Sequence, residues 1–464
     1  MIGNVYRKLP KSVQYAAGYA YGVIPPSIRY GKVFRETYAF LQESQWWSRE
    51  QLEEYQLEQL SKLLHHAYEN VPYYRRVFDE RGLKPKDIQD FKDLQQLPYL
   101  TKDDFKNHFK ELVATNINSK NLPLSHTSGT SGKPLQFYTS RSIGQKELAF
   151  IFHQWSRVGY EPGDSRVEMR GAISEHGNPV QFNPASKVLR LSPRVDNMET
   201  AKYYLQRIKK FKSHFIHGYP SAITSFAYII KKYDLSVPFQ LKAVLFASEG
   251  VYDWEKKIAG DVFNCRVFSH YGMAEQVVLA AECEASSYYH CLPQYGITEI
   301  DPKTNEIIGT SFLNYINPFI RYRTTDIASA PIPRCDHCGR EYYPVFEKVD
   351  GRIEDYIVTS RGLISPAVIT HPFKDLKTIR STQIIQKSLD LIILRVVHWD
   401  GTDSAAYKTE VQQLSRDLQK ILGDNMQIEI EETEEIEQTK SGKFKWIVSD
   451  VSKDMLEKGL TEVG

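Results

Sequence analysis

The sequence predicts an α/β protein with a large N-terminal domain of several subdomains and a small α+β C-terminal domain. The chain has 464 residues, which is more than a single hydrophobic core normally organises. Between about residues 121 and 346, short apolar strand patterns alternate with helical patterns, as in layered α/β folds. After about residue 351 the pattern becomes strand, strand, helix, strand, which is typical of a separate compact unit.

The first 110 residues or so are expected to form a helical arm. Apolar side chains recur at three- and four-residue steps through much of Ser48–Glu111, and prolines divide this stretch into short helices. Thr101 precedes two acidic residues, as the N-cap of a helix often does. The apolar, tyrosine-rich segment Val13–Ile24 predicts a packed helix or a surface arm, with peripheral contact to a membrane surface as the alternative.

We expect the core and the C-terminal unit to meet near Asp355. The expected domains are residues 1–354, comprising the arm of about 1–110 and an α/β core of about 111–354, and residues 355–464. In the core, the patterns predict helices at 143–157, 198–211, 220–233 and 252–260, and strands at Ala243–Ala247 and Arg266–Phe268. In the C-terminal unit they predict strands at Thr382–Gln386, Leu391–Val397 and Met426–Ile430, and a helix at 404–422.

Composition and charge exclude several classes of protein. Hydrophobic residues make up 41% of the chain and charged residues 25%, which is ordinary for a globular protein. The formal net charge is +2, whereas nucleic-acid-binding proteins usually carry a basic stripe, so no nucleic-acid partner is expected. No apolar run approaches the ~20 residues needed to cross a bilayer, and the first residues lack the pattern of a secretory signal. A cytoplasmic location is therefore expected.

The segment Ser125–Pro134, SHTSGTSGKP, is the strongest single indication of chemistry. Its glycines allow a backbone to approach a ligand closely, and the hydroxyl and N–H groups around Lys133 suit phosphate oxygens. The segment is not a Walker A loop, because Thr127 stands where that pattern requires glycine. Taken alone, such a segment is a surface turn about as often as a phosphate-binding loop.

Five further polar segments follow predicted strands or turns. The first, Ala247–Gly250, ends a strand, and the carboxyl edge of an α/β sheet is the usual position of a ligand. The others are Tyr271–Glu275, Arg321–Asp326, Gly351–Asp355 and the lysine-containing Thr439–Lys443. Each of them, taken singly, is more often packing or solvated surface. Together and in this order they are far more specific.

In this order the six segments resemble the motifs of the adenylate-forming superfamily of acyl- and aryl-CoA synthetases, most closely its phenylacetate–CoA ligase branch. The resemblance covers about residues 50–450. The matches are a phosphate loop at Ser125–Pro134, an adenine-contacting turn at Ser248–Gly250, a Tyr-Gly-x-x-Glu motif at Tyr271–Glu275, a ribose motif at Arg323–Asp326, a hinge at Gly351–Asp355 and a C-terminal loop at Ser441–Lys443. Ala274 replaces the usual Thr or Ser, and Thr325 replaces a common Gly.

The resemblance implies an adenylate-forming fold with a mobile C-terminal domain, and an ATP-dependent, AMP-forming ligase. Such an enzyme activates a carboxylic acid as an acyl-adenylate and transfers the acyl group to CoA. The stretch Pro25–Lys32 also resembles CapK-type proteins of bacterial polysaccharide biosynthesis, for which an amino sugar or another amine would be the acceptor. A nucleotide-binding scaffold without turnover is the third alternative, and a homodimer is a further expectation.

The same resemblance implies roles for individual residues. Lys443 would bridge the carboxylate and the α-phosphate, and Glu275 would hold Mg²⁺, so these two are the expected catalytic residues. Tyr271 would lie against adenine, Asp326 would bind the ribose hydroxyls, and Arg352 would contact the ribose or a phosphate. The full expected nucleotide-binding set is Ser125, Thr127, Ser128, Gly129, Thr130, Ser131, Gly132, Lys133, Ser248, Glu249, Gly250, Tyr271, Gly272, Met273, Ala274, Asp326 and Arg352.

Several aromatic residues and one histidine are candidate walls of the acid pocket. The segment His217–Pro220 resembles the family's segment at the start of a pocket-lining helix. The candidate walls are Phe152, His153, Tyr219 and Phe246, with simple core packing as the alternative. No particular acid follows from them.

The cysteines indicate a second site. A C-x₂-C pair lies about fifty residues after another cysteine and a histidine, and four such ligands could form a tetrahedral structural Zn²⁺ site. The candidate ligands are Cys283, His290, Cys335 and Cys338. Cys291 and His337 are competing ligands, and buried free thiols are the alternative to a metal. Similar cysteines in the phenylacetate–CoA ligase-like group favour zinc.

Overall fold

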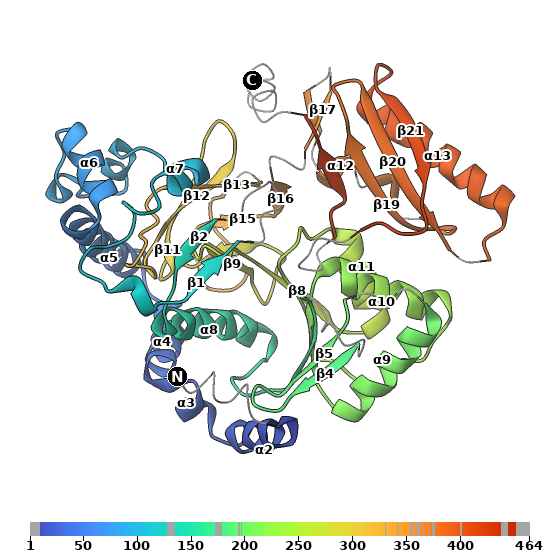
Figure 1. Ribbon diagram of the computed structural model, residues 1–464, viewed down its shortest axis with the longest axis horizontal. Coiled ribbons are helices and arrows are strands. Elements are labelled where there is room, and N and C mark those ends of the chain that lie inside the picture. The colour runs from blue at the N-terminus through green and yellow to red at the C-terminus, as the bar shows by residue number, and fades with distance from the viewer. Residues whose placement is uncertain are drawn as a thin grey trace.

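The protein has an α/β fold, as predicted, and Figure 1 shows a large N-terminal part with a smaller C-terminal unit beside it. The computed structural model describes residues 10–127, 135–171, 179–193, 195, 197–329, 331–340, 342–352, 356–359, 362–364, 366–369, 371–373, 376–399, 401–437 and 444–451. Within these ranges, each helix is too short or too polar to cross a membrane.

Residues 10–107, in the stretch where a helical arm was expected, are mostly helical. The helices are α2 (Lys11–Gly22), α3 (Pro26–Arg29), α4 (Gly31–Ser44), α5 (Arg49–Asn70), α6 (Pro72–Glu80) and α7 (Lys102–Asn107). Ser48 and Thr101 begin α5 and α7 in capping boxes, which pair N–H groups that a helix start leaves unsatisfied. Helix α2 packs against Pro184 so closely that a Cβ on Gly22 would lie 2.5 Å from the Pro184 carbonyl oxygen. Only Gly18 and Gly22 of the segment Val13–Ile24 are buried, and its tyrosines are exposed, so the segment is a surface helix that packs through its glycines.

A sheet of ten strands, in the order β14-β15-β10-β9-β8-β7-β6-β3-β5-β4, forms the centre of the N-terminal part. The strands are β3 (Arg166–Met169), β4 (Val180–Asn183), β5 (Val188–Leu191), β6 (Phe215–Gly218), β7 (Ala243–Phe246), β8 (Arg266–Gly272), β9 (Leu279–Glu282), β10 (Tyr289–Cys291), β14 (Pro331–Ile332) and β15 (Val345–Phe346). Strands β3, β5, β6, β7 and β8 run parallel. Their carboxyl ends therefore share one edge of the sheet.

Helices cover both faces of the parallel strands (Figure 1). Helix α8 (Arg141–Trp155) packs on one face through residues such as Phe152 and Trp155. Helices α9 (Met198–Phe211), α10 (Pro220–Lys232) and α11 (Asp253–Phe263) pack on the other face. Because these strands are buried on both sides, β7 is apolar throughout, which is why it could be predicted from sequence.

Smaller sheets lie beside the central one. Strands β1 (Leu124–His126) and β2 (Gln136–Tyr138) form a hairpin. A four-stranded antiparallel sheet has the order β11-β12-β13-β16, with β11 (Gly296–Ile300), β12 (Glu306–Ser311), β13 (Tyr322–Ala328) and β16 (Val349–Arg352). Strands β17 (Ile357–Thr359) and β18 (Gly362–Ile364) pair with each other. Short 3₁₀ helices lie at Pro85–Asp87, Asp93–Gln96, Ser119–Asn121, Ser156–Val158 and His371–Phe373.

The C-terminal unit is a four-stranded sheet covered by one long helix. The strand order is β21-β20-β19-β22, with β19 (Ile379–Gln386), β20 (Leu391–His398), β21 (Gln427–Glu432) and β22 (Ile447–Ser449). Helix α13 (Ser404–Leu422) buries one apolar stripe against this sheet, and the short α12 (Pro366–Ile369) precedes β19. The unit lies beside α10 and α11 (Figure 1). The boundary near Asp355 stays a prediction, because residues 353–355 lie outside the described ranges.

Candidate active site

Polar turns from neighbouring parallel strands meet at the carboxyl edge of the central sheet. Tyr219 follows β6, Ser248–Gly250 follows β7, and Tyr271–Glu275 spans the end of β8. Ser248 has a φ of 73°, a left-handed conformation that is uncommon for residues other than glycine. Such conformations cost free energy and concentrate at functional sites. The edge therefore has the position and the backbone geometry of a ligand site.

Glu249 joins three segments through one carboxylate. Its Oε2 accepts a hydrogen bond of 3.2 Å from the backbone N–H of Ser221, at the start of α10. Its Oε1 accepts a bond of 3.1 Å from the backbone N–H of Phe444, in the C-terminal unit. The sequence predicted Glu249 as part of the nucleotide turn but gave no sign of this link, because Phe444 is 195 residues away.

Tyr271 and Asp326 lie in direct contact. The Tyr271 hydroxyl donates a hydrogen bond of 2.6 Å to Oδ2 of Asp326 on β13, whose side chain is almost fully buried. Asp326 is paired in register with Arg352 on β16, so the backbones of these two residues are cross-strand neighbours. The side chain of Arg352 lies outside the described atoms. Residues from β8, β13 and β16 that the motifs named separately thus come together.

Glu275 lies just beyond β8 and is half-buried. Its Oε1 accepts a hydrogen bond of 3.4 Å from the Tyr322 hydroxyl. Ala274 beside it is exposed, and Met273 packs against the core. A Cβ at the exposed Gly272 would lie 2.9 Å from Cδ1 of Leu279, so a side chain there would crowd Leu279. Glu275 is therefore the carboxylate that this segment presents at the edge.

The neck of the predicted phosphate loop is well defined. The Thr127 N–H donates to the Leu135 carbonyl, and the Leu135 N–H donates to Oγ1 of Thr127, both at 3.0 Å. Ser125 is paired with Phe137 in the β1–β2 hairpin. Thr127 thus closes the loop through its own backbone and side chain. The predicted residues Ser128, Gly129, Thr130, Ser131, Gly132, Lys133 and Lys443 lie outside the described ranges.

The arginines of the predicted ribose motif brace the sheet. Arg323 pairs with Glu306 on β12 through two N–H groups, at 2.7 and 2.5 Å. Arg321 pairs with Glu299 on β11. These ion pairs fix β13 against its neighbours and so hold Asp326 in place.

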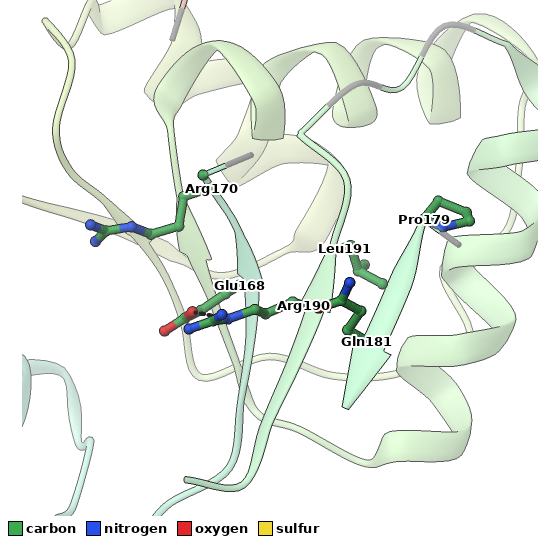
Figure 2. A pocket seen from close by; sticks show the side chains of 7 residues that line it. Glu168, Arg170, Pro179, Gln181, Arg190 and Leu191 are labelled. Carbon is green, nitrogen blue, oxygen red and sulfur yellow. Dashed lines mark hydrogen bonds and ion pairs between the residues drawn. The ribbon is translucent and has the colours of Figure 1, made fainter. Parts of the chain in front are cut away.

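Three of the four predicted pocket walls are core residues. Phe152, His153 and Phe246 are at most 1% exposed; the first two lie on α8 and Phe246 ends β7. Tyr219 is 4% exposed and starts at the carboxyl edge, where its backbone N–H donates to the Met169 carbonyl. Their roles as walls stay predictions. A cavity of about 180 Å³ lies nearby, at the ends of β3 and β5, and sequence reasoning did not find its lining (Figure 2).

The predicted zinc ligands come together in space. The ligand atoms of Cys283, His290, Cys335 and Cys338 lie within 4.8 Å of one another. The competing residues Cys291 and His337 are not part of this group. The Sγ atoms of Cys335 and Cys338 are 3.9 Å apart, and Nε2 of His290 is 3.4 Å from Sγ of Cys338. Three sulfurs and one nitrogen at these separations fit a tetrahedral site.

His290 has the form that a metal ligand needs. Its Nδ1–H donates to the Tyr288 carbonyl at 3.2 Å, which leaves Nε2 directed at the cysteines. Burial lowers the pKa of His290 to about 4, so the ring is neutral at pH 7. The cluster adjoins the start of β8, where Arg266 donates to the Cys283 carbonyl. Tyr271 lies near the other end of this strand, roughly 17 Å from Arg266 at ~3.3 Å per residue.

Comparisons with known proteins found a family model, relatives and solved structures that are similar to this chain. The family model of the CapK C-terminal domain matches residues 357–450. Protein CapK of Staphylococcus aureus is 21% identical over 466 residues, covering 97% of this chain and 100% of that protein. The phenylacetate-coenzyme A ligase of Aromatoleum evansii is 25% identical over 334 residues, covering 67% of this chain and 72% of that protein.

A solved structure has the same fold. The 2-hydroxyisobutyryl-CoA ligase in the postadenylation state, in complex with R3-HIB-AMP, superposes with a TM-score of 0.68 at 18% identity, covering 89% of this chain and 92% of that one. The match thus includes both the N-terminal part and the C-terminal unit. The chain is thus similar to CapK and to the phenylacetate-coenzyme A ligases, and its fold is that of a solved CoA ligase.

Proposed function

We propose that this chain is an ATP-dependent, AMP-forming ligase that activates a carboxylic acid as an acyl-adenylate and transfers the acyl group to CoA. The phenylacetate-coenzyme A ligases among its relatives support this reaction. The observation that carries the proposal is the hydrogen bond between Glu249 and the N–H of Phe444. Phe444 directly follows Lys443, so the C-terminal unit approaches the carboxyl edge at the residue next to the expected catalytic lysine.

In the first half-reaction, a carboxylate oxygen attacks the α-phosphorus of ATP and the bond to pyrophosphate breaks. The protein contributes mainly positioning and charge neutralisation in such a reaction. Asp326 would accept hydrogen bonds from the ribose hydroxyls, and the bond from Tyr271 fixes the orientation of its carboxylate. Lys443 would neutralise charge that develops between the acid and the α-phosphate.

Glu275 is the proposed ligand of Mg²⁺. A half-buried carboxylate at the sheet edge suits a hard cation that prefers oxygen ligands. Bound there, Mg²⁺ would neutralise phosphate charge and orient the triphosphate. The hydrogen bond from Tyr322 holds one carboxylate oxygen of Glu275 in position.

An amine acceptor is the second candidate for the transfer step. CapK of Staphylococcus aureus matches the chain over nearly its whole length, and the CapK C-terminal model matches the C-terminal unit. The first half-reaction is the same in both candidates. They differ in whether release of AMP needs CoA or an amine, such as an amino sugar of polysaccharide biosynthesis.

We further infer that the cysteine–histidine cluster holds a structural Zn²⁺. All four ligand positions would come from the protein, and closed sites of this kind are structural rather than catalytic. The position of the cluster at the start of β8, away from the carboxyl edge, agrees with that role.

The test of the ligase function is ATP–pyrophosphate exchange over a panel of aryl, fatty and amino acids. We expect exchange with at least one acid, and a loss on the order of 10²–10³ in Lys443→Ala, as for one charge-stabilising group. Lys420→Ala, on the exposed face of α13, is the matched control and should keep the wild-type rate. Near-wild-type exchange in Lys443→Ala would show that this lysine has another role. AMP release measured with CoA and with amines then identifies the acceptor.

A further inference from the structure

The cavity at the carboxyl ends of β3 and β5 is lined mainly by charged and polar side chains. Figure 2 shows Glu168, Arg170 and Arg190 with their charged groups on one side of the strands. Gly171, Pro179, Gln181 and Leu191 complete the lining, and the cavity volume is about 180 Å³. Because β3 adjoins β6 in the sheet, the cavity lies along the same edge as Tyr219 and the nucleotide turn.

The single carboxylate of the cavity is already balanced. Arg166, on the same strand, donates to Oε1 of Glu168 through Nε at 3.0 Å and Nη2 at 2.7 Å. Nε of Arg190 lies 3.4 Å from Oε2 of Glu168. Arg190 is the cross-strand partner of both Glu168 and Gln181, so these three side chains form a row on one face.

Arg170 adds a further positive charge near Glu168, which it influences electrostatically. Its Nη1 donates to Nε2 of His217 at 2.9 Å, and Nδ1–H of His217 donates to the Leu245 carbonyl at 3.0 Å. Burial lowers the pKa of His217, which keeps the ring neutral and able to accept this bond. Within the described part of the chain, no carboxylate lies at ion-pair distance from Arg170. Three guanidinium groups thus surround one carboxylate.

We propose that the acid activated by this chain carries a second anionic group, which Arg170 and Arg190 bind in this cavity. This inference rests on the proposed ligase function, because it places the far end of the acid substrate. In the sheet order, β3 is two strands from β7, or ~10 Å at ~4.8 Å per strand. A short dicarboxylic acid with its reacting carboxyl near the Glu249 turn therefore reaches the arginines. Guanidinium groups bind a carboxylate in a directional, bidentate way.

Pyrophosphate exchange with matched acids tests the proposal without any acceptor present. The pairs are butyrate with succinate, hexanoate with adipate, and phenylacetate with 1,4-phenylenediacetate. In at least one pair we expect kcat/KM to be about 10-fold or more higher for the diacid, since a charged hydrogen bond contributes this much. Arg170→Gln should raise the KM of that diacid about 10- to 100-fold and change the matched monoacid less than about 2-fold. Arg170→Lys should restore part of the preference.

The outcomes separate this inference from the ligase function. Arg416→Gln, on the exposed face of α13, is the control and should leave both acids of a pair unchanged. Preference for the monoacid in every pair, or an equal effect of Arg170→Gln on both acids, overturns the second anionic group. If no acid supports exchange, the proposed ligase function is wrong. Calorimetric titration with succinate and adipate then tests separately whether the cavity binds an anion. Binding that Arg170→Gln abolishes supports the anion site, and absence of binding or equal binding overturns it. If the cavity instead binds an anionic group of the acceptor, Arg170→Gln will leave pyrophosphate exchange unchanged for both acids. It will then slow only the release of AMP measured with the acceptor present, and this result also overturns the proposal.

Discussion

At the scale of single residues, Glu147 on α8 is a carboxyl group with a raised pKa. The Tyr295 hydroxyl donates to its Oε2 at 2.7 Å, and burial raises the pKa of Glu147 from 4.5 to about 7. The folded chain therefore keeps this proton to a higher pH than the unfolded chain. The resulting stabilisation is complete below about pH 4.5 and is lost as the pH rises through about 7.

Replacing Glu147 by Gln should remove this dependence. Between pH 5 and 8, the free energy of unfolding of the wild type should fall relative to Glu147→Gln by about 2 kcal/mol, allowing for partial solvent screening. Urea unfolding at a series of pH values measures this difference. Glu36→Gln, at an exposed position of α4, should run parallel to the wild type. Parallel curves for Glu147→Gln would mean that Glu147 ionises normally in the folded chain.

The sequence motifs named individual residues but could not show which distant groups contact them. Tyr271 and Asp326 were both named, but their mutual hydrogen bond joins residues 55 positions apart and needed the fold. Arg170 was missed because nothing around it in the sequence marks it, and its partner His217 lies 47 residues later. A short motif contains its own residues and spacing but not the distant groups that orient them.

At the scale of elements, the cysteine–histidine cluster joins the turn after β9, strand β10 and the loop between β14 and β15. We expect about one zinc per chain in the purified protein by elemental analysis. Cys335→Ser should lower the zinc content and reduce the melting temperature by several degrees, because a structural metal stabilises the folded state. Cys265→Ser, outside the cluster, should keep its zinc. Full-length protein without stoichiometric zinc would refute the site.

Elements were predicted well where burial gives a strong local pattern. Predicted helices at 143–157 and 198–211 correspond to α8 and α9, with small differences at the ends. The antiparallel strands between residues 279 and 352 were not predicted individually, since many are only two to four residues long. Strand β22 was also missed, because its three residues become a strand only by pairing with β19.

At the scale of the whole molecule, aromatic contacts hold the C-terminal unit against the N-terminal part. The rings of Tyr228 on α10 and Trp399 stack with centroids 5.2 Å apart and an interplanar angle of 6°. Nζ of Lys232 lies 3.8 Å from the centroid of the Trp399 ring. Trp254 on α11 approaches Trp446 edge to face. Together with Glu249 and Phe444, these contacts define one docked arrangement of the two parts.

Weakening this contact should slow adenylation more than it destabilises the chain. Stacking and cation–π contacts contribute on the order of 0.5–1.5 kcal/mol, so Tyr228→Ala should reduce pyrophosphate exchange by about 3- to 10-fold. Tyr203→Ala, at an exposed position of α9, is the matched control. Unchanged exchange in Tyr228→Ala, with the melting temperature recorded for both variants, would mean that this arrangement does not serve the first half-reaction.

The bond from Phe444 to Glu249 uses a main-chain donor, and this has an evolutionary consequence. Every amino acid except proline supplies a backbone N–H at position 444. Substitutions of the side chain there therefore leave the hydrogen bond to Glu249 intact. The acceptor has less freedom, because the N–H groups of Ser221 and Phe444 bond separate oxygens, and a carboxylate supplies two acceptor oxygens on one side chain. Selection to keep this hydrogen bond therefore acts on the side chain at position 249 but not on the side chain at position 444. Homologous chains should vary at position 444 while retaining an acid at position 249.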